Sequence, residues 1–138
     1  MGSAVIFPDL EAYLVRRMQA DLDARDEECA RDVLVDRREP DPSDPFPDRL
    51  VVVRDDSGDT GFITGDRSVG ISVLCADEGD CADLSRLVMA LAWQVPGLER
   101  GNPVTVTQSS NGPFWVEEAQ PRFRRYMTFV YGVAGEPL

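Results

Sequence analysis

Residues 67–97, RSVGISVLCADEGDCADLSRLVMALAWQVPG, decide the fold of this 138-residue chain. Apolar residues alternate along Val69–Cys75, which predicts a strand with one face toward a core. After an acidic turn, apolar residues recur at three- and four-residue steps over 84–95, the spacing of one helical face. We expect Asp80 to cap this helix and Pro96-Gly97 to end it. The stretch therefore predicts a helix that lies across a sheet and builds the core.

A second apolar stripe begins at Leu10, directly after Asp9, and predicts a capped helix over about 9–21. Residues 40–47 contain four prolines and should form an extended connection. Strands are expected at 33–35, 50–54, 104–108, 113–117 and 122–133, and the last of these should be the longest. Turns are expected at 109–112 and 118–121. The tail at 134–138 should be loose. The order of elements predicts one α+β domain, residues 1–138. Its mixed or antiparallel β-sheet should carry two helices packed on one face.

The composition narrows the possible chemistry. Hydrophobic residues make up 43% of the chain, which is enough for an ordinary core, and no apolar run reaches the roughly 18 residues of a membrane span. There is no histidine, and all 14 basic residues are arginine. Histidine-based triads, Schiff-base lysines and phosphate-loop lysines are therefore excluded. The three cysteines form no Cys-x-x-Cys pair, and we interpret them as small buried residues of a soluble protein made in a reducing cytoplasm.

The net charge is −11, and much of the acidic excess lies between Asp21 and Asp59. A chain with this charge should not bind nucleic acid by neutralising phosphates. It could instead lie beside DNA without holding it, because its own field repels the backbone.

Three patterns in the sequence could in principle form functional sites. The many carboxylates lie in charge-dense stretches that are typical of a solvated surface rather than of catalytic acid pairs. The DDSGDT segment at 55–60 offers oxygen ligands but lacks the alternation of an EF-hand loop, so we predict no metal site. Arg122, Arg124 and Arg125 beside Phe123 and Tyr126 could stack on bases, but an edge strand whose arginines pair with acids is favoured.

Large apolar residues outside the predicted core stripe point to contacts with other molecules. Met89 and Trp93 are four residues apart on the second helix, displaced from its core face, and Trp115 follows a proline-flanked turn. Such residues are typical of interfaces. A wide core that includes them is the alternative.

Several segments, in this order, resemble one family. They are VIFPDLE at 5–11, the proline-rich segment leading into LVVVR at 50–54, VGISV at 69–73, the helix with Asp83, Leu84, Leu87, Ala90 and Leu91, NGPF at 111–114, and RYMTFVY at 125–131. The chain resembles the tail terminator proteins of long-tailed phages, also called tail-completion or minor tail proteins.

The resemblance implies a structural virion protein with no active site and no cofactor. Such a protein caps the tail tube as a homohexameric ring and joins it to the head–neck connector. Its partners would be copies of itself, the major tail tube protein and the connector, with DNA passing through the lumen unbound and no membrane contact. It would be assembled in the host cytoplasm and reside at the head-proximal end of the tail.

The interface candidates are loop acids and aromatic or methionine side chains: Asp55, Asp56, Asp59, Asp66, Met89, Trp93, Phe114 and Trp115. Two other classes remain open. One is another phage neck or tail-tube component, or a general oligomeric scaffold. The other is a small enzyme or ligand-binding domain.

Overall fold

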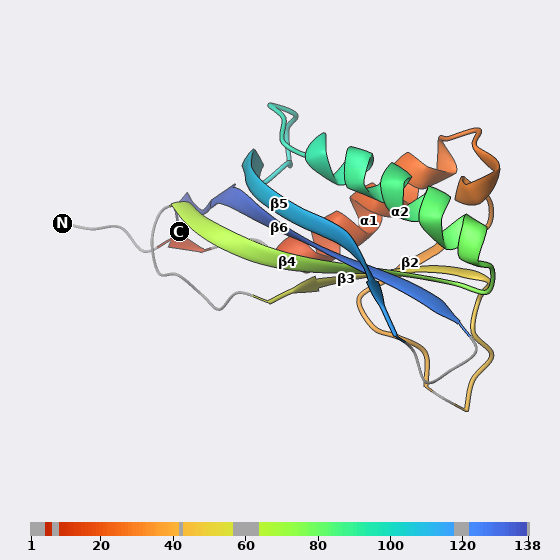
Figure 1. The fold of residues 1–138 in the computed structure, drawn as a ribbon. Helices are drawn as coiled ribbons and strands as arrows, with labels where there is room; N and C mark the ends of the chain where they lie inside the picture. The colour runs from red at the N-terminus through yellow and green to blue at the C-terminus, as the bar shows by residue number, and fades with distance from the viewer. Residues whose placement is uncertain (1–4, 7–8, 42, 57–63, 118–121, 138) are drawn as a thin grey trace.

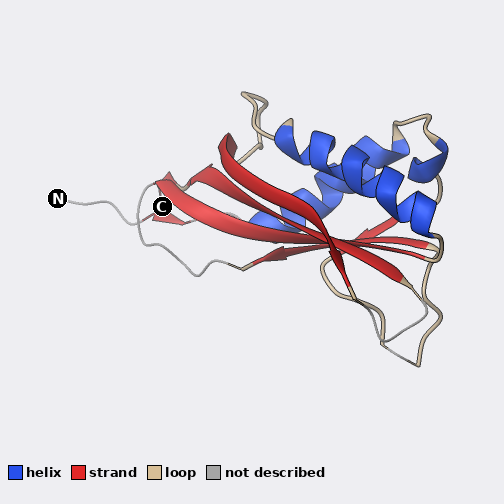
Figure 2. Cartoon of the chain, viewed as in Figure 1, coloured by secondary structure: helices blue, strands red, loops and turns tan. Residues whose placement is uncertain are grey.

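The computed structural model describes residues 5–6, 9–41, 43–56, 64–117 and 122–137. The main sheet has five strands. The sheet is twisted, and helices α1 (Leu10–Asp23) and α2 (Glu78–Trp93) lie on one face of it, as Figures 1 and 2 show. The strands, in spatial order, are β2 (Leu34–Asp36), β3 (Arg49–Asp55), β4 (Thr64–Cys75), β6 (Phe123–Ala134) and β5 (Val104–Val116). The α+β fold predicted from the sequence is confirmed.

The sheet is mixed because its pairings differ in direction. β2 runs parallel to β3, whereas β3, β4, β6 and β5 pair antiparallel. β3 lies between β2 and β4, and its residues Leu50–Val53 are all buried. A strand buried on both faces needs a continuous apolar run, which accounts for the sequence LVVV.

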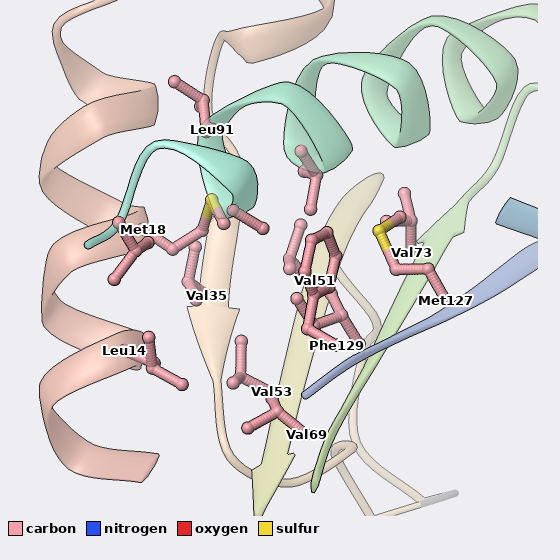
Figure 3. Close-up of a cluster of buried hydrophobic side chains, with 14 of the residues drawn as sticks. Leu14, Met18, Val35, Val51, Val53, Val69, Val73, Leu91, Met127 and Phe129 are labelled. Atoms are coloured by element: carbon pink, nitrogen blue, oxygen red, sulfur yellow. The ribbon is translucent and has the colours of Figure 1, made fainter. Parts of the chain in front are cut away.

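The main core lies between the sheet and the helices (Figure 3). Leu14 and Met18 of α1 and Leu91 of α2 pack over alternate residues of the strands. The buried alternate positions are Val51, Val53, Val69, Ile71, Val73, Met127, Phe129 and Tyr131. The period-two pattern of the strands and the three-to-four spacing of the helices thus meet in one layer.

A smaller cluster lies on the helix-free face of the sheet. Leu50, Val52 and Leu74 are buried there, and Phe46 packs against them. Phe46 belongs to the connection between β2 and β3, which passes on the side opposite the helices (Figure 1). The proline-rich segment thus covers one end of this face, where even-numbered strand residues are apolar.

The start of α2 differs from the prediction. Asp77, not Asp80, is the N-cap, and its carboxylate accepts the Asp80 backbone N–H at 2.9 Å. Asp80 lies in the first helical turn and forms an ion pair with Arg49 at 2.9 Å. Asp77 has the extended backbone of an N-cap, with φ −117° and ψ 136°, because the chain has just left β4. The helix ends at Trp93, ahead of Pro96.

The predicted turn at 109–112 is wrong. Residues Val104–Val116 form one 13-residue strand, so β5 and not β6 is the longest. The pairing of β5 with β6 shifts register between Asn111 and Phe114, around Gly112, which has φ +100°. The turn-like residues therefore form a bulge in a continuing strand. The predicted turn at 118–121 lies outside the described residues.

The predicted loose tail is also wrong within the described residues. β6 continues to Ala134, and a short strand β7 (Glu136–Pro137) pairs antiparallel with β1 (Val5–Ile6). Two-residue strands have no periodicity for sequence reasoning to detect. None of the helices in the described ranges has the length and apolar character needed to cross a bilayer.

Candidate assembly surface

β5 forms one edge of the sheet and pairs only with β6 among the described strands. The opposite edge is the three-residue strand β2. A long edge strand presents a row of backbone N–H and C=O groups that a further strand can pair with. β5 therefore offers much the longer of the two edges.

Exposed apolar side chains gather on this edge. Val106, Phe114, Trp115 and Val116 of β5 are exposed, and Phe123 of the neighbouring β6 is exposed beside them. Phe114 is 53% exposed and Trp115 47%. Aromatic rings of this size at an unpaired edge are typical of an interface and unusual on a surface left in water.

Trp115 lies in a small cluster with an arginine. The strand register places Trp115 opposite Arg125, whose guanidinium carbon lies 4.0 Å from the centre of the Trp115 ring. Phe123 meets the same ring edge-on, with centroids 6.4 Å apart. Arg125 Nε is buried and has no hydrogen-bond partner among the described residues. Tryptophan and arginine are the residues that most often dominate binding energy at interfaces.

Phe114 points to the other face of the sheet. It lies opposite Tyr126, just as Val116 lies opposite Arg124. Since successive residues of a strand alternate between faces, the edge carries exposed aromatic rings on both sides.

The two helix candidates behave differently. Met89 is half-buried and packs against the core, whereas Trp93 is 46% exposed and meets Phe129 edge-on at 6.2 Å. The Thr107 hydroxyl lies 3.4 Å from the Trp93 carbonyl oxygen, to which it donates. Trp93 therefore lies beside the first half of β5, about 25 Å along the strand from Trp115. The structure therefore places Trp115 in β5 and Trp93 beside the first half of that strand, so the two tryptophans do not lie in one patch.

The acidic candidates do not gather on the aromatic edge. Asp55 is half-buried at the end of β3 and pairs with Arg67, and its backbone N–H donates to Glu11. Asp56 is exposed and lies against the Tyr126 hydroxyl. Asp66 is exposed on β4 and accepts from the Gln108 side chain of β5. Asp59 lies outside the described residues.

The helix-free face contains a hollow of about 910 Å³. Four arginines line it together with three carboxylates and Tyr126: Arg37, Arg38, Arg54, Arg124, Glu11, Glu39 and Asp56. Sequence reasoning missed this feature because the arginines come from three separate segments. Two sequence features could have indicated the hollow. One is the Arg37-Arg38 doublet, and the other is the alternation of strand residues, which places Arg54 and Arg124 on the face away from the core.

Most groups in the hollow are held by neighbours. Arg124 donates to Ser72 Oγ at 3.2 Å and pairs with Glu39, and Arg37 lies 3.5 Å from Glu11. Arg38 and Arg54 are exposed and form no ion pair with a described residue. Two arginine charges therefore border the hollow without an ion pair to any carboxylate in the described ranges.

The floor of the hollow contains a close contact over a glycine. Tyr126 and Asp56 meet above Gly70, where an added Cβ would lie 2.7 Å from Asp56 Oδ2 and closer still to the Tyr126 hydroxyl. Burial and the Asp56 charge raise the pKa of Tyr126 above its ordinary value. A side chain at position 70 would therefore require the ends of Tyr126 and Asp56 to shift.

The basic cluster of β6 lies inside the sheet, which corrects the predicted edge strand. β6 has β4 on one side and β5 on the other. Of the three arginines, Arg124 alone pairs with an acid within the described part of the chain, as expected. Arg122 lies over the Phe46 ring, 3.1 Å from its centre, and Arg125 lies over Trp115. Aromatic rings of the same chain therefore cover two of the three arginines.

No group of three or more His, Cys, Asp or Glu side chains is placed to hold a metal ion within the described ranges. Cys75 and Cys81 are buried, as predicted, and Cys29 is half-buried. The pKa of the Cys75 thiol is raised above its ordinary value, mainly by its hydrogen bond with Cys81 and secondly by its burial.

No protein-family model matches the chain, and no curated protein sequence matches it. Among solved structures, a chain of "Virion of native gene transfer agent (GTA) particle" is similar, with 19% identity and a TM-score of 0.49. The alignment covers 94% of this chain and 99% of that chain. At that identity and TM-score, we draw no conclusion about fold or function from the likeness.

Proposed function

We propose that the protein is a structural virion subunit that acts as a tail terminator. Copies of the chain would form a hexameric ring that caps the tail tube and joins it to the head–neck connector. The observation that supports this proposal best is the β5 edge, a 13-residue strand with exposed aromatic side chains and no second strand beside it among the described residues. The resemblance of the sequence to tail terminator proteins is the reason for proposing this particular assembly.

The edge favours assembly because apolar side chains stay exposed along it. Natural monomers blunt long edges with charged side chains, prolines, bulges or a covering element. β5 contains one proline, Pro113, and irregular pairing with β6, yet four of its apolar side chains are exposed and no described strand covers its outer side. In a head-to-tail ring, every copy would offer this edge to the next copy, and closure of the ring would leave no edge free.

The charge of the chain suits a ring around DNA. With a net charge of −11, the surface would repel the phosphate backbone rather than bind it. DNA could then pass through the lumen without adhering. The proposed role involves no covalent step.

The same edge would also serve a tail-tube protein or a general oligomeric scaffold, and this is the second candidate. The two roles differ in how the assembly ends. A terminator forms closed rings, whereas a tube protein stacks into long tubes. Negative-stain images of the purified protein, alone and with preformed tubes, would separate these outcomes.

The decisive experiment is deletion of the gene, followed by imaging of particles in the lysates. We expect overlong tails without heads, because an uncapped tube continues to grow. Complementation with the unchanged gene should restore tails of normal length with heads attached. Normal tails in the deletion strain would rule out the terminator role.

A further inference from the structure

We propose that the arginine-lined hollow on the helix-free face receives an acidic surface of a second copy of this chain. The contact would join copies head to tail. This inference depends on the proposed self-assembly, and it identifies the charged residues that would meet between neighbouring copies. The arginine hollow is the hollow of about 910 Å³ described above.

The receiving side is built to accept carboxylates. Arg38 and Arg54 are exposed at the hollow and form no ion pair with a described residue, and Arg37 and Arg124 lie beside them. An arginine fork binds a carboxylate through two parallel N–H donors. Val52 and Val116 add apolar surface to the same lining.

The complementary surface lies at the start of α2. A smaller hollow of about 300 Å³, which we call the acidic hollow, combines four carboxylates with one arginine. Its polar lining residues are Glu27, Glu28, Asp80, Asp83 and Arg86. Glu28 is exposed and has no ion pair with a described residue. Leu87 and Cys29, both half-buried, supply apolar surface between the charges.

The two hollows cannot meet within one molecule. The acidic hollow is lined by residues of α2 and of the segment that follows α1, whereas the arginine hollow is lined mainly by even-numbered strand residues that face away from the helices. Figure 1 shows both helices on one face of the sheet. The sheet and its core separate them. Many of the charges in each hollow already form ion pairs within one molecule, such as Arg124 with Glu39 and Asp83 with Arg86. Arg38 and Arg54 in one hollow and Glu28 in the other have no ion pair with a described residue, so a contact between them can form only between copies. A contact between two different surfaces of the same chain is heterologous. Repeated around an axis, it closes into a ring.

A nucleic acid is a poorer occupant of the arginine hollow. Glu11, Glu39 and Asp56 lie among the arginines and would repel phosphates, which bring no positive charge to offset them, whereas the acidic hollow includes Arg86. The net charge of −11 would repel the rest of the strand. A carboxylate-bearing surface of limited size, placed by apolar neighbours, fits this mixed lining better.

Charge reversal tests the contact. The arginine variant is Arg38→Glu with Arg54→Glu, and the acid variant is Glu28→Arg with Asp83→Arg. The matched control is Arg16→Glu with Arg100→Glu, two exposed positions outside both hollows that give the same change in net charge as the arginine variant. Self-association is measured by sedimentation velocity at about 50 mM and about 500 mM salt, and folding is checked by thermal unfolding.

We expect the unchanged protein to self-associate more weakly at high salt. The arginine variant should associate at least about tenfold more weakly than the control variant, and the acid variant at least about tenfold more weakly than the unchanged protein. A one-to-one mixture of the arginine and acid variants should regain association, because every contact in it is again between opposite charges. This rescue distinguishes a direct contact from loss of folding.

Unchanged association in both variants, or no rescue in the mixture, would overturn the proposed contact. Binding of a short DNA duplex that is weakened in the arginine variant would also overturn it, since the hollow would then hold phosphates. Neither result touches the terminator role, which depends on the deletion phenotype. Normal tails after gene deletion, with charge rescue intact, would instead reject the terminator role and leave the contact standing.

Discussion

Tyr131 has the largest fully buried side chain among the described residues, and it also makes a polar contact inside the core. Its hydroxyl donates to the Ala92 carbonyl oxygen at 2.7 Å, and its ring stacks on Phe129 with centroids 5.6 Å apart. Burial raises the pKa of Tyr131 above its ordinary value near 10. The folded state therefore holds this proton more tightly than the unfolded state does. The associated stability is present below about pH 10 and is lost as the pH rises further.

We predict that Tyr131→Phe lowers the free energy of unfolding by about 1 kcal/mol at neutral pH, because a buried hydrogen bond is lost. Between about pH 9 and pH 11, the unchanged protein should lose more stability than this variant. Urea unfolding across that range provides the measurement. Tyr126→Phe is the control, because Tyr126 is less buried than Tyr131 and should therefore account for less of the loss. If the free energy of unfolding fell equally with pH in the Tyr131 variant and in the unchanged protein, Tyr131 would not be the source of the pH dependence.

Gly70 is constrained by contacts and not by a turn. We predict that Gly70→Ala destabilises the protein by about 1–3 kcal/mol, because the new Cβ would meet both Tyr126 and Asp56. In a Tyr126→Ala background, the same substitution should cost clearly less. A double-mutant cycle measured by urea unfolding tests this coupling. Additive effects would show that the cost arises elsewhere.

At the scale of elements, local spacing predicted the helices and the strand faces but not every boundary. The sequence contains two overlapping capping patterns, Asp77-x-x-Asp80 and Asp80-x-x-Asp83, and spacing alone cannot choose between them. The choice depends on where β4 ends, because the N-cap needs an extended backbone. That end is fixed by pairing with β3 and β6, which local sequence does not reveal.

We predict that Asp77→Ala costs about 1 kcal/mol of unfolding free energy, because the helix loses its cap. Asp83→Ala should change stability by less than about 0.5 kcal/mol, because its pair with Arg86 is exposed. Chemical denaturation of both variants distinguishes the two patterns. A larger loss of stability in the Asp83 variant than in the Asp77 variant would indicate that Asp80, not Asp77, is the N-cap.

β5 illustrates a second limit of sequence reasoning. Ser109–Pro113 has the composition of a hairpin turn, yet the strand continues through it. Bulges and turns both use glycine with positive φ, so composition cannot separate them. The aromatic candidates Phe114 and Trp115 could be named from their residue type. The arginine hollow could not, because it exists only after three distant segments are folded together.

At the scale of the whole molecule, the exposed aromatic edge should matter for assembly and little for folding. We predict that Phe114→Ser with Trp115→Ser leaves the free energy of unfolding within about 1 kcal/mol. The same change should weaken self-association at least about tenfold. Leu98→Ser is the matched control, because Leu98 is fully exposed and lies off the β5 edge. Sedimentation velocity gives the association, and complementation of the deletion strain gives tail length. Unchanged association with normal tails would remove β5 from the interface.

The one-sided helix layer has a consequence for how the chain can change in length. The helix-facing residues of β3, β4 and β6 are all odd-numbered, including Val51, Ile71 and Phe129, and the even-numbered residues face away. Inserting one residue after Thr128 would move every later side chain of β6 to the opposite face of the sheet, so that core residues would face solvent. Inserting two would leave each side chain on its original face. Thermal unfolding should therefore find the single insertion unfolded and the double insertion folded, so that length variation within these strands is tolerated only in pairs.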